Sequence, residues 1–179
     1  MSDNELFVLA IFCICVFIFF YKRKPDDEGR LSDASVSVKT VLRMLEEFEV
    51  EKSEKLKSGY TEKLVQNQLR DFLRDRIQHV SDEYGIEGIN ATKIDLDIGN
   101  GKVGVELKLA KAVFKAAGQD RMVGQVNTFV KNKYDSDNLI VLIISEQAHL
   151  NDLAMRKQIE ERLFDLGVEV LFFPLEKTS

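Results

Sequence analysis

Apolar and charged residues alternate most regularly between residues 92 and 109. The alternation predicts one β-strand over 92–98 and a second over 103–109, because successive side chains of a strand point to opposite faces. The Gly-Asn-Gly sequence at 99–101 is typical of a hairpin turn. One face of this hairpin is apolar and contains Ile94, Leu96, Ile98, Val103, Val105, Leu107 and Leu109. The other face contains Asp95, Asp97, Gly104, Glu106 and Lys108.

Helical spacing of apolar residues recurs on both sides of the hairpin. Thr61 can cap a helix that ends near Gln78. The apolar run 139–144 predicts a strand that is covered on both faces. The other expected elements are a helix over 36–57, a short strand with turns over 79–90, a helix over 112–133 with an interruption near Gly118, a helix over 149–166 and a strand over 168–175. This order predicts an α/β fold with a mixed sheet flanked by helices.

The N-terminal run 6–21 contains no charged residue. As a helix it spans about 24 Å, and Tyr21 with the basic residues 22–24 extends it to the lipid headgroups. We therefore expect a single-pass transmembrane anchor. Since the basic flank follows the run, the rest of the chain is expected in the cytoplasm, at the inner membrane if the source is bacterial. A cleaved signal peptide is the alternative, but acidic residues precede the run and no A-x-A-like site follows it.

The predicted organisation has four parts. Residues 1–24 form the anchor with its basic flank, 25–35 a polar linker, 36–58 a charged amphipathic helix and 59–179 the α/β domain. The apolar stripe of the charged helix either packs on the domain or pairs with a second copy of the chain in a homodimer. Two or three heptads are too few for a coiled coil, so packing on the domain is favoured.

Composition narrows the classes of function. The net charge of -5 argues against a uniformly basic nucleic-acid-binding surface. Both cysteines, Cys13 and Cys15, lie in the apolar run, so neither a disulfide nor a zinc site is expected in the domain. Residues 101–134 nevertheless contain seven basic side chains against two acidic ones. Phosphate binding needs such a local excess, and the candidate nucleic-acid contacts are Lys102, Lys111, Lys115 and Arg121.

The polar face of the hairpin is the candidate for chemistry. Three carboxylates and a lysine on one face are costly to bury unless they compensate one another or hold a cation. Oxygen ligands suit a hard ion such as Mg²⁺. A lysine beside the ion can position a water or stabilise the charge that develops on a phosphoryl group.

Asp95, followed eleven residues later by Glu106-Leu107-Lys108 across a strand-turn-strand, resembles the motif of the PD-(D/E)XK nuclease superfamily. Glu62 on the preceding helix resembles the helical glutamate that many members have. Gln125 with Phe129 resembles the Gln-x-x-x-Tyr motif of the exonuclease-like branches, with phenylalanine in place of tyrosine. The resemblance covers roughly residues 60–145 and implies a restriction-endonuclease-like fold.

The resemblance implies a role for each matching residue. Asp95, Glu106 and the Leu107 carbonyl would bind Mg²⁺ or Mn²⁺, with Glu62 as an outer ligand. Lys108 would orient the attacking water or stabilise charge, and Gln125 would support the site or touch substrate. The implied activity is hydrolysis of phosphodiester bonds, with DNA preferred to RNA as substrate because of its prevalence in the family.

Three alternatives stay open. Asp97 could be the ligand in place of Asp95, because the two share a face of the predicted strand. The domain could keep the nuclease-like fold without catalysis and act as a membrane-bound binding or assembly module. The hairpin could also be a solvated surface with weak cross-strand ion pairs. A dinucleotide site is excluded, because the G-x-G-x-x-G match at 99–104 is followed by a predicted strand rather than a helix.

Overall fold

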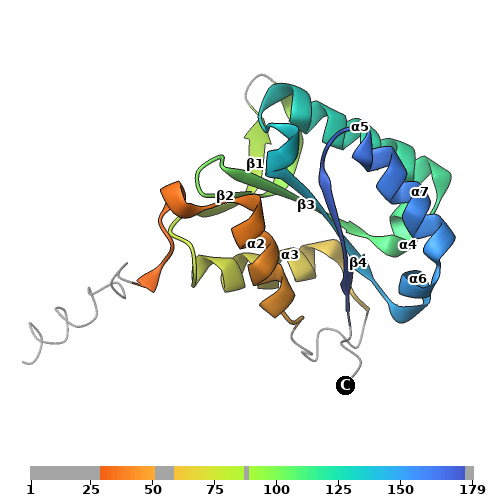
Figure 1. Cartoon of the computed structure of the whole chain (residues 1–179), viewed down its shortest axis with the longest axis horizontal. Coiled ribbons are helices and arrows are strands. Elements are labelled where there is room, and N and C mark those ends of the chain that lie inside the picture. Colours follow the sequence, from red (N-terminus) through yellow and green to blue (C-terminus); the bar gives the residue numbers. More distant parts are fainter. Residues whose placement is uncertain (1–28, 51–58, 87–88, 176–179) are drawn as a thin grey trace, which may run out of the picture. The chain divides into compact units, whose positions relative to one another are not determined.

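The computed structural model describes residues 29–50, 59–86 and 89–175 (Figure 1). The predicted anchor over 1–24, residues 25–28 of the predicted linker and residues 51–58 of the predicted charged helix lie outside these residues. None of the helices in the described ranges is long and apolar enough to cross a membrane. All the helices and strands given below belong to one compact unit that begins at Leu31.

The described residues form a five-stranded mixed sheet with the strands in sequence order. Neighbouring strands are antiparallel from β1 to β3 and parallel from β3 to β5. This arrangement confirms the predicted α/β fold with a mixed sheet. The strands are β1 (Val80–Ile86), β2 (Ile89–Ile98), β3 (Val103–Leu109), β4 (Leu139–Ser145) and β5 (Glu169–Pro174).

Helices cover both faces of the sheet and enclose two hydrophobic cores (Figure 1). The first core lies beneath α2 (Val38–Glu47) and α3 (Glu62–Arg74), and the second beneath α5 (Ala116–Asn132) and α7 (Leu153–Phe164). Strand β4 is buried along its whole length, as its apolar run predicts for a strand between two layers of helices. Shorter elements complete the fold: η2 (Asp33–Ser35), α4 (Ala110–Val113), η4 (Ser136–Asn138) and α6 (Gln147–Asn151).

Two predicted helices are each divided in two. The helix expected over 112–133 is interrupted at Phe114 and Lys115, between α4 and α5, rather than near Gly118. Gly118 instead lies inside α5, where an added Cβ would come within 2.0 Å of the carbonyl oxygen of Ala112. The helix expected over 149–166 is divided at Asp152, whose side chain caps α7 by accepting from the Met155 amide at 3.1 Å.

The N-terminal part of the domain differs from the prediction in two ways. Leu31, placed in the predicted linker, pairs with Ile77 and so belongs to the folded unit. Helix α2 ends at Glu47 rather than near residue 57, because Phe48 adopts an extended conformation and packs against Phe173 with ring centroids 5.5 Å apart. The apolar side of α2 is buried in the first core, which confirms that this helix packs on the domain.

The remaining elements agree with the sequence in type. Thr61 caps α3 by accepting from the Leu64 amide at 3.2 Å, as predicted, although α3 ends at Arg74. The segment 79–90 contains a longer strand than expected, β1. The turn at 99–101 has positive φ at all three residues, including Asn100, which is the backbone that its glycines favour.

Candidate active site

The candidate site lies where β2 and β3 separate, which we call the strand fork. The two strands pair regularly from Ile98 and Val103 to Leu96 and Val105. Asp95 precedes Leu96 in β2. There a side-chain hydrogen bond takes the place of backbone pairing, because Oδ2 of Asp95 accepts from the Leu107 amide at 2.8 Å. The fork therefore fixes a carboxylate between two strands by a main-chain hydrogen bond.

The alternation of β2 changes phase at this point. Leu96 and Ile98 pack in the first core, as predicted, but Ile94 packs in the second core. Asp95 lies beside α3, where Gln66 donates from Nε2 to the Asp95 carbonyl at 2.7 Å. The prediction that Ile94 shares a face with Leu96 is thus wrong, and the phase change separates Asp95 from the regular polar face.

Glu106 is the most deeply buried acidic group of the site, with 1 % of the residue exposed. Its Oε1 accepts from the Lys108 ammonium at 2.5 Å. Its Oε2 is buried and receives no hydrogen bond from a donor among the described residues, and the Glu106 carboxyl lies within hydrogen-bonding reach of the Asp95 carboxyl. A buried carboxylate oxygen without a donor is costly, so this atom marks a place where a cation or a donor would be favourable.

Lys108 connects two acidic residues on different elements. Besides Glu106, its Nζ lies 3.7 Å from Oε1 of Glu62, the first residue of α3. The Lys108 side chain is 14 % exposed. Helix α3 and strand β3 thus bring the predicted acid–lysine set together, although Glu62 contacts Lys108 rather than the other carboxylates.

Burial and mutual repulsion perturb these groups. Burial, followed by the negative charge of Asp95, raises the pKa of Glu106 to about 8, and Lys108 offsets only part of this shift. Burial also raises the pKa of Asp95, against the opposing effects of Lys108 and the Leu107 amide, and the pKa of Glu62. Burial alone would lower the pKa of Lys108, but Glu106, Glu62 and Asp95 together raise it.

The donor set fits a hard divalent cation in part. The carboxylates of half-buried Asp95 and buried Glu106 are neighbours, and the Oε2 of Glu106 is the kind of ligand that Mg²⁺ takes together with waters and substrate oxygens. However, no three carboxylate, histidine or cysteine side chains of the described residues converge closely enough to enclose a metal ion. The set is therefore a two-carboxylate site beside a lysine, with Glu62 set apart.

Asp97 has a different environment from Asp95. It is 3 % exposed and is bound by two groups that follow α5: Lys133 lies 2.9 Å from its Oδ1, and the Tyr134 hydroxyl donates to the same oxygen. A carboxylate that accepts hydrogen bonds from both an ammonium and a phenol has a structural role, joining β2 to the residues after α5. The structure thus favours Asp95 over Asp97 as the group at the fork.

The other predicted site residues are more dispersed. Gln125 is half-buried on α5, and within the described part of the chain no hydrogen bond joins its side chain to the fork residues, while Phe129 is fully buried in the second core. The four basic candidates are exposed. Lys102 precedes β3, about 20 Å along the strand from Lys108, whereas the others follow the fork end of β3: Lys111, Lys115 and Arg121.

Sequence reasoning missed two features beside the fork. Gln66 is 3 % exposed and holds Asp95 from α3; the signal was its place one turn after Glu62, on the apolar side of the helix. A cleft of about 290 Å³ opens next to Leu109 and is lined by residues that include Tyr60, Lys111 and His149. Through Lys111, this cleft includes part of the predicted basic segment.

Comparison of the chain with protein families, with curated proteins and with solved structures found no match.

Proposed function

We propose that this chain is a metal-dependent nuclease that hydrolyses phosphodiester bonds, with DNA as the preferred substrate. The observation that carries the proposal is the buried Glu106 carboxyl at the strand fork, next to Asp95 and in contact with Lys108, whose Oε2 receives no hydrogen bond from a donor among the described residues. Such a group needs a cation or a donor. Mg²⁺ or Mn²⁺ would meet that need.

The order of elements gives further support. Helix α3, the three antiparallel strands, α5 and the parallel strand β4 follow one another in the order that the resemblance to PD-(D/E)XK nucleases implies. The acidic residues and the lysine that carry the resemblance lie on α3, β2 and β3, and Gln125 lies on α5. This arrangement is what a restriction-endonuclease-like domain requires.

Each residue of the site would have its own role in the proposed reaction. Asp95, Glu106 and the Leu107 carbonyl would hold the metal ion, which supplies a Lewis acid and a bound water of lowered pKa. Lys108, whose ammonium donates to Glu106, would orient the water or stabilise charge on the phosphate. Gln66 would keep Asp95 in place through its carbonyl. Lys111 and His149 would contact the nucleic-acid backbone along the neighbouring cleft.

A second candidate function is favoured by one observation. The Lys108 ammonium is bonded to Glu106 and lies near Glu62, and no three metal-binding side chains converge among the described residues. A binding or assembly module with the same fold would also retain such an internal ion-pair set. In either case the apolar run 6–21 would tether the domain to the cytoplasmic side of a membrane.

The test is cleavage by the full chain in mild detergent of circular DNA, linear DNA and RNA, each with Mg²⁺, Mn²⁺ or EDTA. Glu106→Gln and Lys108→Met change charge at the fork with little change of shape. Lys131→Met is the matched control, because Lys131 is an exposed lysine on α5.

Metal-dependent cleavage that the control retains and both fork variants lose would support the nuclease. Binding to DNA without cleavage of any substrate would favour the binding module. Cleavage that survives both fork variants would contradict the assignment of the site.

A further inference from the structure

Helix α7 exposes large apolar side chains at both of its ends. Leu153 is 69 % exposed and Phe164 is 80 % exposed, and they are the exposed large hydrophobic residues of the described ranges. They are eleven positions apart, which is close to three turns of an α-helix. Both therefore lie on the same side of α7, about 16 Å from each other along its axis.

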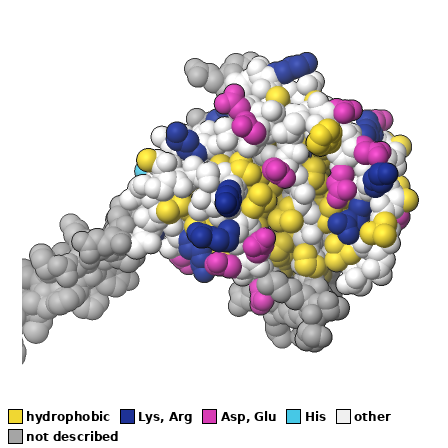
Figure 2. All heavy atoms as spheres, in the orientation of Figure 1, with side chains coloured by type: hydrophobic (Ala, Val, Ile, Leu, Met, Phe, Trp, Pro, Cys, Tyr) yellow, Lys and Arg dark blue, Asp and Glu magenta, His cyan; other side chains and the backbone are white. Residues whose placement is uncertain are grey.

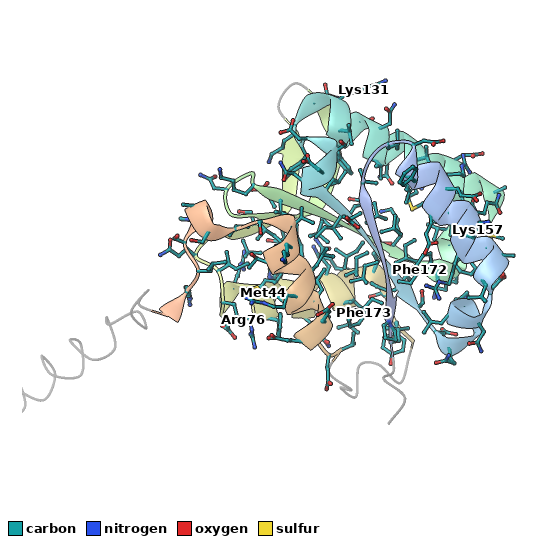
Figure 3. All side chains as sticks on the ribbon, in the orientation of Figure 1. Met44, Arg76, Lys131, Lys157, Phe172 and Phe173 are labelled. Atoms are coloured by element: carbon teal, nitrogen blue, oxygen red, sulfur yellow. The ribbon has the colours of Figure 1, made fainter. Side chains whose placement is uncertain are left out.

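The middle of that side has a basic residue followed by an acidic one. Lys157 lies one turn after Leu153, and Glu160 lies one turn before Phe164. The order along the exposed side is thus apolar, basic, acidic, apolar. Lys157 projects from α7 in Figure 3. Its side chain is 76 % exposed, and its Nζ lies 3.6 Å from Oε1 of Glu161 on the same helix, while Glu160 lies 4.0 Å from Arg156; such exposed pairs are weak.

This pattern is complementary to itself when a second copy of α7 runs in the opposite direction. In such a pair Leu153 faces Phe164 of the second copy, and Lys157 faces Glu160 of the second copy. Both matches have the same centre, between residues 158 and 159, so a single two-fold axis satisfies them together. A two-fold axis also forms each contact twice, because residue i meets j and j meets i.

The same side of α7 borders the edge of the sheet. Strand β5 is the outermost strand of the described sheet. Between it and α7 lies a groove of about 570 Å³, whose lining includes Lys157, Glu160, Phe164 and Val170. In Figure 2 apolar side chains form a band across this face, where β5 runs in Figure 1, with charged side chains on either side. An edge strand with apolar surroundings tends to be covered by another chain.

We propose that the outer side of α7 and the outer edge of β5 bind a second copy of this chain about a two-fold axis. Leu153 and Phe164 supply the apolar contacts, and Lys157 and Glu160 set the antiparallel register. The strand fork lies on β2 and β3, at least two strands away from β5, so both copies keep an open site. The dimer does not depend on whether the fork cleaves nucleic acid.

The experiment is sedimentation equilibrium of the full chain in a detergent matched to the density of the solvent. The wild type is expected to show a monomer–dimer equilibrium. Lys157→Glu places like charges together twice and is expected to weaken the dimer about tenfold or more, as is Glu160→Lys. The double variant with both changes restores opposite charges across the axis and is expected to recover the affinity of the wild type.

Two further variants keep the result interpretable. Phe164→Asp removes an exposed apolar contact without touching either core, so it should dissociate the dimer and leave the thermal midpoint nearly unchanged. Lys131→Glu is the matched control, because Lys131 is an exposed lysine of α5 and belongs to neither α7 nor β5. A wild type that stays monomeric at all concentrations overturns the proposal. So does a dimer that Lys157→Glu and Phe164→Asp leave intact, or one that the double variant fails to restore.

Discussion

Glu106→Gln is expected to stabilise the metal-free protein at alkaline pH. The folded chain holds this carboxyl at a pKa of about 8, because it is buried next to Asp95, whereas an unfolded chain titrates it near its ordinary value of 4.5. Between these values the folded state binds more protons than the unfolded state, so the free energy of unfolding falls as pH rises. Glutamine keeps the shape of the side chain and cannot ionise.

The size of the effect follows from the shift. One pKa unit corresponds to about 1.4 kcal/mol, so the shift from 4.5 to about 8 sets an upper limit of roughly 5 kcal/mol above pH 8. The variant also removes a carboxylate neighbour from Lys108. We therefore expect a net gain of about 2–3 kcal/mol near pH 9 and a change within about 0.5 kcal/mol near pH 5, where Glu106 is already neutral.

The assay is urea unfolding of both proteins in EDTA, followed by far-ultraviolet circular dichroism, at about pH 5 and about pH 9. Burial also raises the pKa values of Asp95 and Glu62, which changes stability in the same direction in both proteins. The difference between the two proteins therefore reports the ionisation of Glu106 together with its interaction with Asp95. If the variant were equally or less stable than the wild type near pH 9, the buried, repelled carboxylate would not exist in the folded state.

Three other predictions test the surroundings of the fork. Gly104→Ala places a Cβ 2.5 Å from Cδ1 of Ile94 and 2.9 Å from Cδ1 of Leu139, and should cost about 1–3 kcal/mol in urea unfolding. Asp97→Asn weakens the bond to Lys133 and should lower the free energy of unfolding by about 1–3 kcal/mol, leaving any response to Mg²⁺ unchanged. Mg²⁺ should raise the thermal midpoint of the wild type more near pH 8 than near pH 6, because its ligands must be deprotonated.

The type and order of the elements could be predicted because two periodicities dominate the sequence. Strict alternation and the Gly-Asn-Gly turn define the hairpin of β2 and β3, and a run apolar on both faces defines β4. These signals depend only on neighbouring residues in the sequence, so they can be recognised without knowledge of tertiary contacts. The mixed sheet then follows from the short turn within the hairpin and the helical connection after it.

Boundaries were harder to predict, because they depend on tertiary contacts. The end of α2 is set by Phe48, which turns into the core against Phe173, and nothing near Phe48 in the sequence marks the end of a helix. The sequence neighbours of Leu31 are polar, as in a linker, yet the Leu31 backbone forms hydrogen bonds with the backbones of Arg76 and Gln78. A fragment meant to retain the folded domain should accordingly begin before Leu31.

At the candidate site the sequence brought together the right residue types but could not separate the two aspartates. In a strand pattern with a period of two, Asp95 and Asp97 are equivalent. In the structure the Asp95 carboxylate lies at the fork, whereas the Asp97 carboxylate is bound by Lys133. The separation requires that Ile94 cross to the second core, and Gly104 permits this because its missing Cβ leaves room for the Ile94 side chain. A glycine in the strand partner of Asp97 was thus the signal for an irregularity, and it identifies Asp95 as the aspartate at the fork.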